Sequence, residues 1–216
     1  MLGAAIERGP LSRLDDDALR PLLRRAVTKS YPKNAIILSE GDKTEGLYII
    51  VAGRVRIFLA NENGKEVTLG VEGPGEYFGE MTLDGGPRSA SVVTLEASRF
   101  LVVPRADLEA FLGEHPAFAV HVLGKLIRRV RILTNNVKSL ALQDVYGRFT
   151  RLLHELAVEQ DGKRVVPEKL TQQEIANRIG ASREMVSLIL KDLTKGGYLS
   201  TAGRRITIEK KLPLEW

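Results

Sequence analysis

The chain has 216 residues, of which 44% are hydrophobic and 27% are charged, and it contains no cysteine. This length fits one large domain or two small ones, and the composition is that of a globular protein. The absence of cysteine excludes disulfides, thiolate zinc sites, cysteine nucleophiles and iron–sulfur clusters held by the chain's own thiolates. Apolar runs are too short for a membrane helix and the first one is too short for a signal peptide, so we expect a cytoplasmic protein without membrane contact.

The net charge of +5 is divided unequally along the chain. Residues 1–115 hold 14 Lys+Arg and 17 Asp+Glu, a net −3, whereas residues 116–216 hold 18 and 10, a net +8. A basic C-terminal part suits a polyanion such as nucleic acid, because Lys or Arg that contacts phosphate releases condensed counterions. A basic surface that is merely solvated explains the charge equally well.

Between Tyr31 and Pro104 the sequence consists of short β-branched runs separated by glycine, which predicts an all-β sandwich or barrel. Glycine at the joints permits the positive φ that tight turns need. Examples of these runs are residues 35–38, 47–51, 55–59, 67–69, 91–94 and 100–103. Before them, residues 11–27 have apolar positions at helical spacing behind Asp15, Asp16 and Asp17, which predicts a helix.

Residues 116–141 are predicted to form one long helix that begins at Pro116. After Ala119, its apolar residues alternate steps of three and four, the 3.5-residue repeat of a coiled coil. This dimer seam consists of Leu123, Leu126, Val130, Leu133, Val137 and Leu140. Ile127 and Ile132 lie off the seam and are expected to pack on the barrel. An ordinary buried helix is the alternative, but five basic residues without an acid favour a parallel homodimer.

A domain boundary is expected near residues 141–144, followed by a helix over 145–158 that Asp144 caps. Further on, Thr171-Gln172-Gln173-Glu174 has the form of a capping box and predicts another helix start. Ala176, Gly180 and Val186 follow at the spacing of a helix-turn-helix. In this motif a small residue lets two helices approach, glycine forms the left-handed turn and a branched residue fixes the second helix.

The second helix of this motif is predicted to carry residues that read DNA. Ser182 caps it, and its first turn displays Arg183 and Glu184 outward. In a major groove, arginine bonds guanine O6 and N7, and a carboxylate accepts a hydrogen bond from cytosine N4. A hairpin wing is expected around Ala202-Gly203, where Arg204 and Arg205 meet phosphates. A structural helical hairpin with surface charges is the alternative, and it leaves the coincidence of these signals unexplained.

Residues 78–92 are the densest candidate site in the barrel. Glycine lets the backbone approach an anion, Arg88 offers two parallel donors to phosphate oxygens, and Ser89 adds a hydroxyl. A carboxylate beside a phosphate is repelled unless it turns toward hydroxyls, so Glu80 is assigned to a sugar hydroxyl. In the alternative interpretation, Glu80 and Arg88 simply pair with each other. If the first interpretation holds, Arg88→Ala is expected to remove the response to the ligand and to spare folding.

These two motifs resemble those of the cyclic-AMP receptor protein and FNR family of bacterial transcription regulators, and the likeness covers essentially the whole chain. Gly79-Glu80 with residues 87–92 resembles the family's phosphate-binding cassette, and residues 182–186 resemble its recognition helix. The resemblance implies an α+β protein with three parts. They are an N-terminal cyclic-nucleotide-binding β-barrel of jelly-roll type over residues 1–115, a dimerisation helix over 116–141 and a winged helix-turn-helix DNA-binding domain over 142–216.

The resemblance also implies roles for individual residues. Glu80 bonds the ribose 2′-hydroxyl, Arg88 and Ser89 hold the cyclic phosphate, and Arg183 and Glu184 read a TGTGA-like half-site. The implied nucleotide site comprises Ile57, Phe78, Gly79, Glu80, Arg88, Ser89, Ala90, Arg129 and Thr134. The implied DNA-contacting set comprises Thr171, Gln172, Gln173, Ser182, Arg183, Glu184, Ser187, Arg204 and Arg205.

We therefore expect a homodimeric transcription activator gated by cyclic AMP bound between the barrel and the dimer helix. Its expected partners are double-stranded DNA with a palindromic TGTGA-like site and RNA polymerase, and no metal is expected. Leu133 and Thr134 stand where the best-known cyclic-AMP receptor of the family has adenine-contacting Thr and Ser. Leu188 stands in place of a second base-reading arginine, so the outer part of the half-site is expected to be read loosely. The stretch between Glu80 and Arg88 is also shorter.

Other inputs and other classes of function remain open on the sequence. In one alternative the loop of residues 78–92 binds cyclic di-GMP in place of cyclic AMP. In another, the dimer binds DNA without any ligand. A cupin-like metalloenzyme needs inward histidines on strands, whereas His115, His121 and His154 all follow the barrel. A regulatory subunit without DNA function has no use for Arg183 and Glu184. The lack of cysteine argues against the oxygen-sensing FNR branch, whose cluster needs thiolates.

Overall fold

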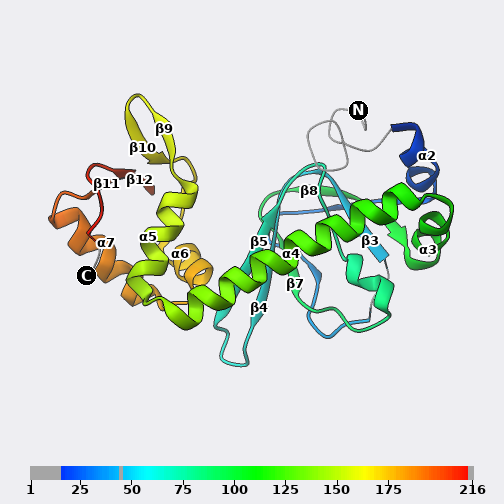
Figure 1. The fold of residues 1–216 in the computed structure, drawn as a ribbon, viewed down its shortest axis with the longest axis horizontal. Helices are drawn as coiled ribbons and strands as arrows, with labels where there is room; N and C mark the ends of the chain where they lie inside the picture. The colour runs from blue at the N-terminus through cyan, green and yellow to red at the C-terminus, as the bar shows by residue number, and fades with distance from the viewer. Residues whose placement is uncertain (1–15, 44–45, 214–216) are drawn as a thin grey trace. The chain divides into compact units, whose positions relative to one another are not determined.

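The computed structural model describes the backbone of residues 16–43 and 46–213. The chain forms two compact units (Figure 1). Unit 1 consists of residues up to Ala60 together with Leu69–Val130, and unit 2 consists of Asn61–Thr68 together with the residues from Arg131 onward. Among the described helices, none combines the length and the apolar character that crossing a membrane requires.

The barrel predicted from the glycine-punctuated runs is present as two antiparallel sheets. Its strands are β1 (Val27–Tyr31), β2 (Ile36–Leu38), β3 (Gly46–Ala52), β4 (Val55–Ala60), β5 (Glu66–Glu72), β6 (Tyr77–Phe78), β7 (Ser91–Thr94) and β8 (Ser98–Pro104). The sheets have the orders β1-β8-β3-β6 and β2-β7-β4-β5. Strands β1 and β6 were not among those expected. Residues 11–15 of the predicted first helix lie outside the described residues, and Val27 begins β1 instead of ending that helix.

Strand β3 is buried on both faces because its alternate side chains enter two different cores. Tyr48 and Ile50 face the core between the sheets, where the ring of Tyr48 stacks on Phe78 at 5.1 Å between centroids. Leu47 and Ile49 face a second core, beneath the helices. Tyr48 lies opposite Val102 of β8 and Phe78 of β6. This register fixes the position of β6, and the candidate site begins at the end of that strand.

Three helices cover the second core of unit 1: α2 (Asp16–Arg25), α3 (Arg105–Glu114) and the first part of α4 (Pro116–Leu142). Phe118 and Val122 of α4 are buried there, and Leu126 packs against the same core. The expectation that Ile127 and Ile132 pack on the barrel is wrong, since both are about half exposed. Ile127 follows Phe118 by about two and a half helical turns and so lies on the opposite side of α4. Ile132 lies beyond the part of α4 that belongs to unit 1.

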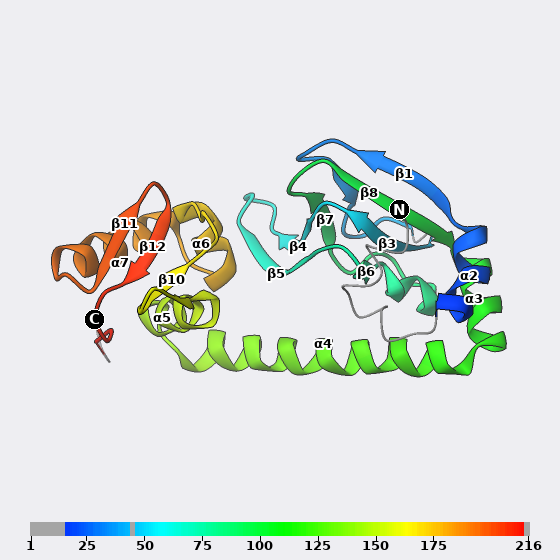
Figure 2. The same ribbon diagram turned by 90° about the horizontal axis from the view of Figure 1, so that it is seen from above.

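Unit 2 is a helix-turn-helix with a small sheet (Figure 2). Its remaining elements are α5 (Val145–Leu156), β9 (Val158–Gln160), β10 (Lys163–Val166), α6 (Gln172–Ile179), α7 (Arg183–Lys195), β11 (Leu199–Ala202) and β12 (Arg205–Ile208). The sheet has the order β11-β12-β10-β9. Phe149, Leu153, Val186 and Ile189 lie in the core that joins the helices to the sheet.

The three predicted helix caps are confirmed. Asp144 accepts a hydrogen bond from the backbone N–H of Gly147 at 2.7 Å. Thr171 accepts one from Glu174, whose carboxylate in turn accepts from the Thr171 N–H, so the capping box is complete. Ser182 accepts from Met185 at 3.2 Å. Because these bonds satisfy amides of the first helical turns, they fix where α5, α6 and α7 begin.

Two hairpin turns of unit 2 differ from the sequence expectation. Hairpin β9-β10 was not predicted, although Asp161 and Gly162 at its tip both have positive φ and form a favoured two-residue turn. In the wing, the left-handed residues are Gly203 and Arg204, one position later than the expected Ala202-Gly203 turn. Arg204 therefore lies in the turn itself, and the following strand begins at Arg205, as expected.

The turn between α6 and α7 is expected to require glycine. Gly180→Ala should lower the free energy of unfolding of unit 2 by about 1 to 2 kcal/mol, since φ is +65° and alanine resists the left-handed conformation. A Cβ there would also lie 3.0 Å from Cδ2 of Leu140. Urea unfolding followed by circular dichroism measures this change.

The matched control is Gly162→Ala, which has a φ of +73° but no atom within 4 Å of the new Cβ. It should cost only the backbone strain, and therefore less than Gly180→Ala. Equal losses in the two variants would contradict a role for the Leu140 contact, and no loss at Gly180 would contradict the left-handed turn.

Candidate functional sites

The candidate cradle is a tight loop between β6 and β7. It contains a short 3-10 helix, η2 (Glu80–Asp84), which is flanked by Gly79 and Gly85 with φ of 83° and 74°. A Cβ at Gly79 would lie 2.8 Å from Nη1 of Arg88 and 2.9 Å from the carbonyl oxygen of Gly46. Position 79 therefore admits only glycine, both for its conformation and for the close approach of its neighbours.

Arg88 is the centre of this loop. Its side chain is 4% exposed, and it donates hydrogen bonds from Nη1 to the carbonyl oxygen of Gly79 and from Nη2 to that of Gly46, at 3.2 and 3.1 Å. Its backbone N–H donates to the carbonyl oxygen of Asp42, and its own carbonyl accepts from Gly41, each at 2.8 Å. One buried arginine therefore joins β3, the end of β6 and the 41–42 turn, which sequence reasoning did not find.

The other cassette residues lie around this arginine. Glu80 is half-buried at the start of η2, next to the glycine whose carbonyl Arg88 binds. Ser89 is exposed, and its hydroxyl donates to Sδ of Met81 at 2.9 Å. Ala90 is half-buried. The structure therefore brings Glu80, Arg88, Ser89 and Ala90 together in one loop, as the cassette interpretation requires.

Two further residues of the predicted nucleotide site lie on the barrel strands. The side chain of Phe78 is buried in the core between the sheets, where it stacks on Tyr48, so only its backbone is available to a ligand. Ile57 is half-buried on β4 and packs against that same core.

The face of α4 that covers the barrel carries ion pairs within unit 1. Nζ of Lys125 lies 2.8 Å from the Glu76 carboxylate and also donates to the carbonyl oxygen of Tyr77. Nη1 of Arg129 lies 3.8 Å from the carboxylate of Glu72. Burial raises the pKa of Glu72, and the charge of Lys125 acts in the opposite direction. Arg129, predicted as a nucleotide contact, is thus engaged with an acid of β5.

Thr134, the remaining residue of the predicted nucleotide site, is exposed on α4 beside Leu133. The structure does not bury it against any other element. The hydroxyl is therefore open to solvent in a single chain, as a group that meets a ligand or a second chain would be.

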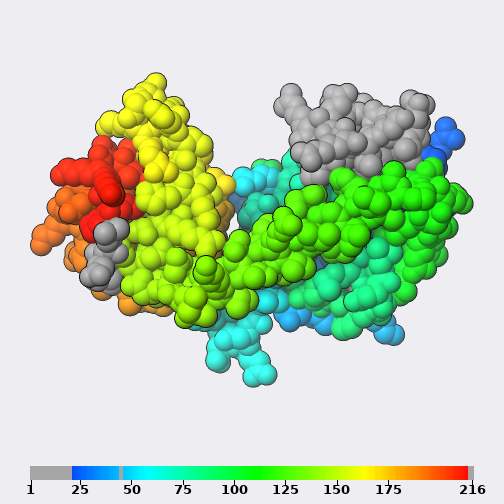
Figure 3. Space-filling model, in the orientation of Figure 1, coloured from blue at the N-terminus to red at the C-terminus, as the bar shows by residue number. Residues whose placement is uncertain are grey.

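The predicted dimer seam forms an exposed apolar row along α4. The exposed fractions are 56% for Leu123, 61% for Val130, 36% for Leu133, 66% for Val137 and 48% for Leu140. Leu126 is the exception, because it packs against the barrel core. The side chains of α4 lie on the visible surface in the space-filling view (Figure 3).

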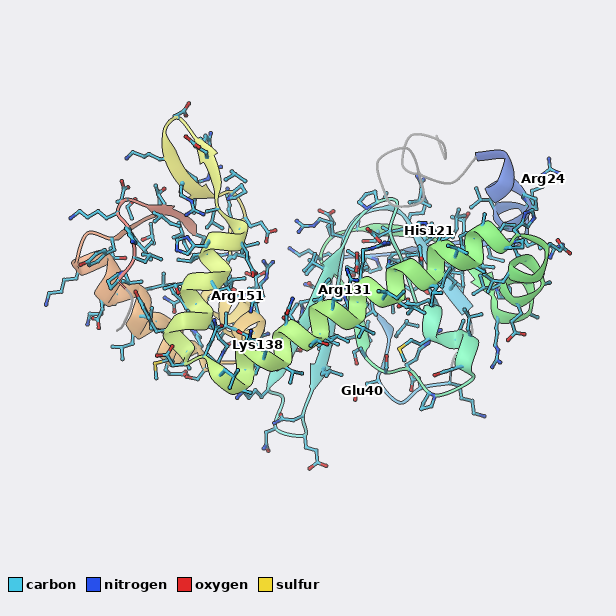
Figure 4. All side chains as sticks on the ribbon, viewed as in Figure 1. Arg24, Glu40, His121, Arg131, Lys138 and Arg151 are labelled. Carbon is cyan, nitrogen blue, oxygen red and sulfur yellow. The ribbon has the colours of Figure 1, made fainter. Side chains whose placement is uncertain are left out.

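Basic side chains accompany this apolar row. Arg131 and Lys138 project from α4 into solvent, while Arg151 belongs to α5 and pairs with Glu155 at 2.7 Å (Figure 4). An exposed row of this length on a single chain indicates a surface that another molecule covers.

The candidate DNA-reading surface lies on the outer face of α7. Arg183 and Glu184 are exposed on its first turn, as predicted, and Ser187 follows one turn later. A groove of about 410 Å³ runs along this face and is lined by Gln172, Arg183, Glu184, Ser187, Leu188 and Lys191. A wider hollow of about 1250 Å³ lies between this helix, the start of α6 and the wing, where Thr201 and Arg204 line it.

The two hollows are basic. Their charged lining residues are Arg183, Lys191, Lys195 and Arg204, with Glu184 as the acid among them. Sequence reasoning missed Lys191 and Lys195, although eight residues after Arg183 is a position on the same face of a helix.

Some of the other predicted DNA-contacting residues line the wider hollow, and others do not. Thr171 and Gln172 line the wider hollow together with Gln173, whose amide also donates to Asn177 at 2.8 Å. The hydroxyl of Ser182 is used as a cap. Arg205 is exposed on β12. The structure thus places the predicted residues at the two helix starts and the wing, and all of them except Ser182 and Arg205 line one of the two hollows.

Elsewhere in the molecule, His154 receives a hydrogen-bond contact from Arg164. Nη1 of Arg164 lies 2.9 Å from Nδ1 of His154, and Nη2 donates to its carbonyl oxygen at 3.2 Å. Burial and the charge of Arg164 lower the pKa of the imidazole. Within the part of the chain that the structure describes, no group of three His, Asp or Glu is arranged to hold a metal ion.

Comparison with known proteins agrees with this geometry. Residues 28–115 match the family described as cyclic nucleotide-binding domain, and residues 147–215 match the Crp-like helix-turn-helix domain. The CRP-like cAMP-activated global transcriptional regulator of Mycobacterium tuberculosis is 32% identical over 205 residues, which are 93% of this chain and 92% of that protein. The cAMP-activated global transcriptional regulator CRP of Salmonella typhimurium is 31% identical over 199 residues, 89% of this chain and 94% of that protein.

Solved structures have the same fold. The c-di-GMP responsive global regulator CLP of Xanthomonas campestris has a TM-score of 0.81 at 26% identity, and the match covers 91% of this chain and all of that chain. The catabolite activator protein of Thermus thermophilus has a TM-score of 0.56 at 29% identity, with 94% and 93% covered. A barrel with a phosphate-type cassette and a winged helix-turn-helix together define a DNA-binding transcription regulator with a cyclic-nucleotide-binding domain. The chain belongs to the cyclic-AMP receptor protein and FNR family, and its relatives are regulators, not enzymes.

The contacts of Arg88 change one sequence expectation, namely that Arg88→Ala spares folding. Truncation would leave the buried carbonyl oxygen of Gly46 without the Arg88 donor and would take one of two donors from the carbonyl oxygen of Gly79, which keeps the Thr82 N–H at 3.1 Å. We expect it to lower the free energy of unfolding by about 1 to 3 kcal/mol, the cost of one buried acceptor that is left unsatisfied. Urea unfolding of unit 1 measures the loss.

Ser89→Ala serves as the control for Arg88→Ala. Its hydroxyl is exposed and bonds only weakly to the sulfur of Met81, so its unfolding free energy should change by less than about 0.5 kcal/mol. If Arg88→Ala were as stable as Ser89→Ala, the structural role of the guanidinium would be refuted.

Proposed function

We propose that this protein is a homodimeric transcription activator whose affinity for DNA increases when cyclic AMP binds between the barrel and α4. The observation that carries the proposal is the single loop in which Gly79, Glu80, Arg88 and Ser89 lie around one buried guanidinium. Guanidinium and hydroxyl groups donate hydrogen bonds to a phosphate, and a carboxylate accepts them from ribose hydroxyls. The loop therefore has the groups that would bind a nucleoside monophosphate.

In this proposal each cradle residue has a defined part. Arg88 and Ser89 hold the cyclic phosphate, and Glu80 accepts from the ribose 2′-hydroxyl. Ile57, Ala90 and the backbone at Phe78 and Gly79 form the walls. Arg129 and Thr134 approach the ligand from α4, and Arg129 then exchanges its contact with Glu72, 3.8 Å away, for one with the ligand.

The dimer of the proposal forms through the exposed row on α4. Leu123, Val130, Leu133, Val137 and Leu140 present apolar side chains at a 3.5-residue repeat, the spacing that buries a seam between two parallel helices. A ligand changes the affinity for DNA only if it binds the DNA-competent state better than the other state. Thr134 lies next to the seam residue Leu133, so a ligand contact there acts directly on the pairing of the two helices.

The proposed DNA partner is a palindrome, since a two-fold dimer presents two copies of α7 to two half-sites. Arg183 bonds guanine and Glu184 accepts from cytosine of a TGTGA-like half-site. Gln172, Gln173, Arg204 and Arg205 contact the phosphates that flank it. Because the target is a promoter, the protein acts in the cytoplasm, and as an activator it contacts RNA polymerase.

A second effector is favoured by one specific observation, the fold similarity to a regulator of Xanthomonas campestris that is described as c-di-GMP responsive. In that alternative the same cradle binds cyclic di-GMP, and the DNA-reading surface is unchanged. Leu133, which has no hydroxyl to offer a base, fits either ligand. DNA binding without any ligand is the third possibility that the experiment below separates.

The test is fluorescence anisotropy of a labelled TGTGA-N6-TCACA duplex, titrated with protein at fixed salt. Cyclic AMP is expected to tighten binding, and Arg183→Ala to weaken it by about tenfold or more in the presence of the nucleotide, because a bidentate arginine–guanine pair contributes about 1 to 3 kcal/mol. Salt must be constant, since the phosphate contacts alone change affinity by orders of magnitude.

The control ligands are cyclic di-GMP and no ligand. Tighter binding with cyclic di-GMP alone would replace the proposed effector, and equal binding in all three conditions would refute gating. An Arg183→Ala protein that binds as tightly as the parent would refute the reading of the half-site.

The dimer is tested by a charge placed on the seam. Val137→Asp should convert the dimer to a monomer in sedimentation velocity, because a carboxylate would be buried without a partner between two helices. Leu142→Asp is the matched control, since Leu142 is 75% exposed at the end of α4 and lies off the seam. A Val137→Asp protein that sediments as a dimer would contradict the proposed interface.

A further inference from the structure

One apolar side chain stands on the DNA-reading face of α7, in a groove whose other lining residues are all polar. Leu188 is 47% exposed and lines the 410 Å³ groove, together with Gln172, Arg183, Glu184, Ser187 and Lys191. It takes no part in the core of unit 2, to which α7 contributes Val186, Ile189, Leu190 and Leu193. Packing within the chain therefore does not account for a leucine here.

The position of Leu188 on the helix places it at the level of the bases. It follows Glu184 by four residues, so it stands on the same face, about 6 Å further along the helix axis. Lys191 follows it by three residues and continues this face. A side chain between two groups that face DNA enters the same major groove as they do.

Leucine has no hydrogen-bonding group, and this restricts what it can recognise. Guanine, adenine and cytosine present hydrogen-bonding atoms at the major-groove edge, whereas thymine adds a C5-methyl group. Contact between this methyl and a leucine removes apolar surface of both from water. A guanine or cytosine edge at the same place would lose water without gaining a partner.

We propose that Leu188 is a specificity-determining residue that recognises the methyl group of a thymine in each half-site. The inference rests on the proposed reading of DNA by α7. Base pairs are about 3.4 Å apart along the duplex, so the thymine lies within about two base pairs of the cytosine that Glu184 reads. Arg183 and Glu184 then select by hydrogen bonds, and Leu188 selects by apolar contact.

The experiment replaces thymine by deoxyuridine, which has the same hydrogen-bonding groups and lacks only the methyl. Each thymine of the TGTGA half-site and of its complement is replaced in turn, symmetrically in both half-sites, and affinity is measured by anisotropy with cyclic AMP present. At one position, the parent protein should bind the deoxyuridine duplex about fourfold more weakly per half-site, the effect of one buried methyl group.

Leu188→Ala should bind the thymine duplex more weakly than the parent and should lose the difference between thymine and deoxyuridine. Val158→Ala is the matched control, because Val158 is 49% exposed on β9 and does not line either hollow on the DNA-reading side. It should keep the full difference. The loss of discrimination in Leu188→Ala alone would assign the methyl contact to this side chain.

Three outcomes overturn the inference and are distinguishable. If the parent discriminates deoxyuridine at no position while Arg183→Ala still weakens binding, DNA reading stands and the thymine contact is refuted. A discrimination that persists in Leu188→Ala refutes it too, because another group then reads the methyl. If the parent binds the duplex no better than an unrelated sequence, the proposed half-site fails, and the inference fails with it.

Discussion

The organisation of this protein depends on a constraint in α4, which has more apolar surface than one chain can bury. Phe118, Val122 and Leu126 pack on the barrel, whereas the row from Leu123 to Leu140 stays exposed. One helix therefore closes the core of unit 1 and also carries the exposed apolar row that the proposed dimer would bury. In the proposed dimer the barrel face and the seam belong to the same helix, so α4 itself connects the proposed ligand site with the pairing of the two chains.

In the cradle of unit 1, too, one residue has two roles. Arg88 holds two backbone carbonyl oxygens and so shapes the loop in which it also meets the proposed ligand. A residue with both tasks links ligand binding to the local structure of β3 and η2. Its neighbour Ser89 bonds only the sulfur of Met81, so loss of Arg88 and loss of Ser89 would differ in their effect on the loop of the proposed phosphate site.

The sequence was sufficient for those parts of the structure that local rules determine. Helix caps at Asp144, Thr171 and Ser182 follow from side chains that bond the nearest backbone amides, and they were confirmed. Glycine at the joints of the β runs indicated the barrel. The outward face of α7 followed from its period, although Lys191 and Lys195 were overlooked on it.

The features that could not be predicted from the sequence depend on contacts between distant residues. The partners of Arg88 are 9 and 42 residues away and are backbone atoms, which carry no sequence signal. Ile127 and Phe118 are equally apolar, and only the barrel decides which of them is covered. Strand β6 has two residues, too few for a period, and it exists because β3 pairs with it.

We propose that a nucleotide and DNA favour the same state of the dimer, and thermodynamic linkage between the two binding reactions tests this proposal. If the nucleotide raises DNA affinity by some factor, operator DNA must raise nucleotide affinity by the same factor. Isothermal titration of cyclic AMP into the protein, free and saturated with the palindromic duplex, measures this factor. Cyclic AMP is expected to bind more tightly to the DNA-bound protein, by the same factor by which it tightens the binding of DNA. The same cyclic AMP affinity with and without DNA would contradict it.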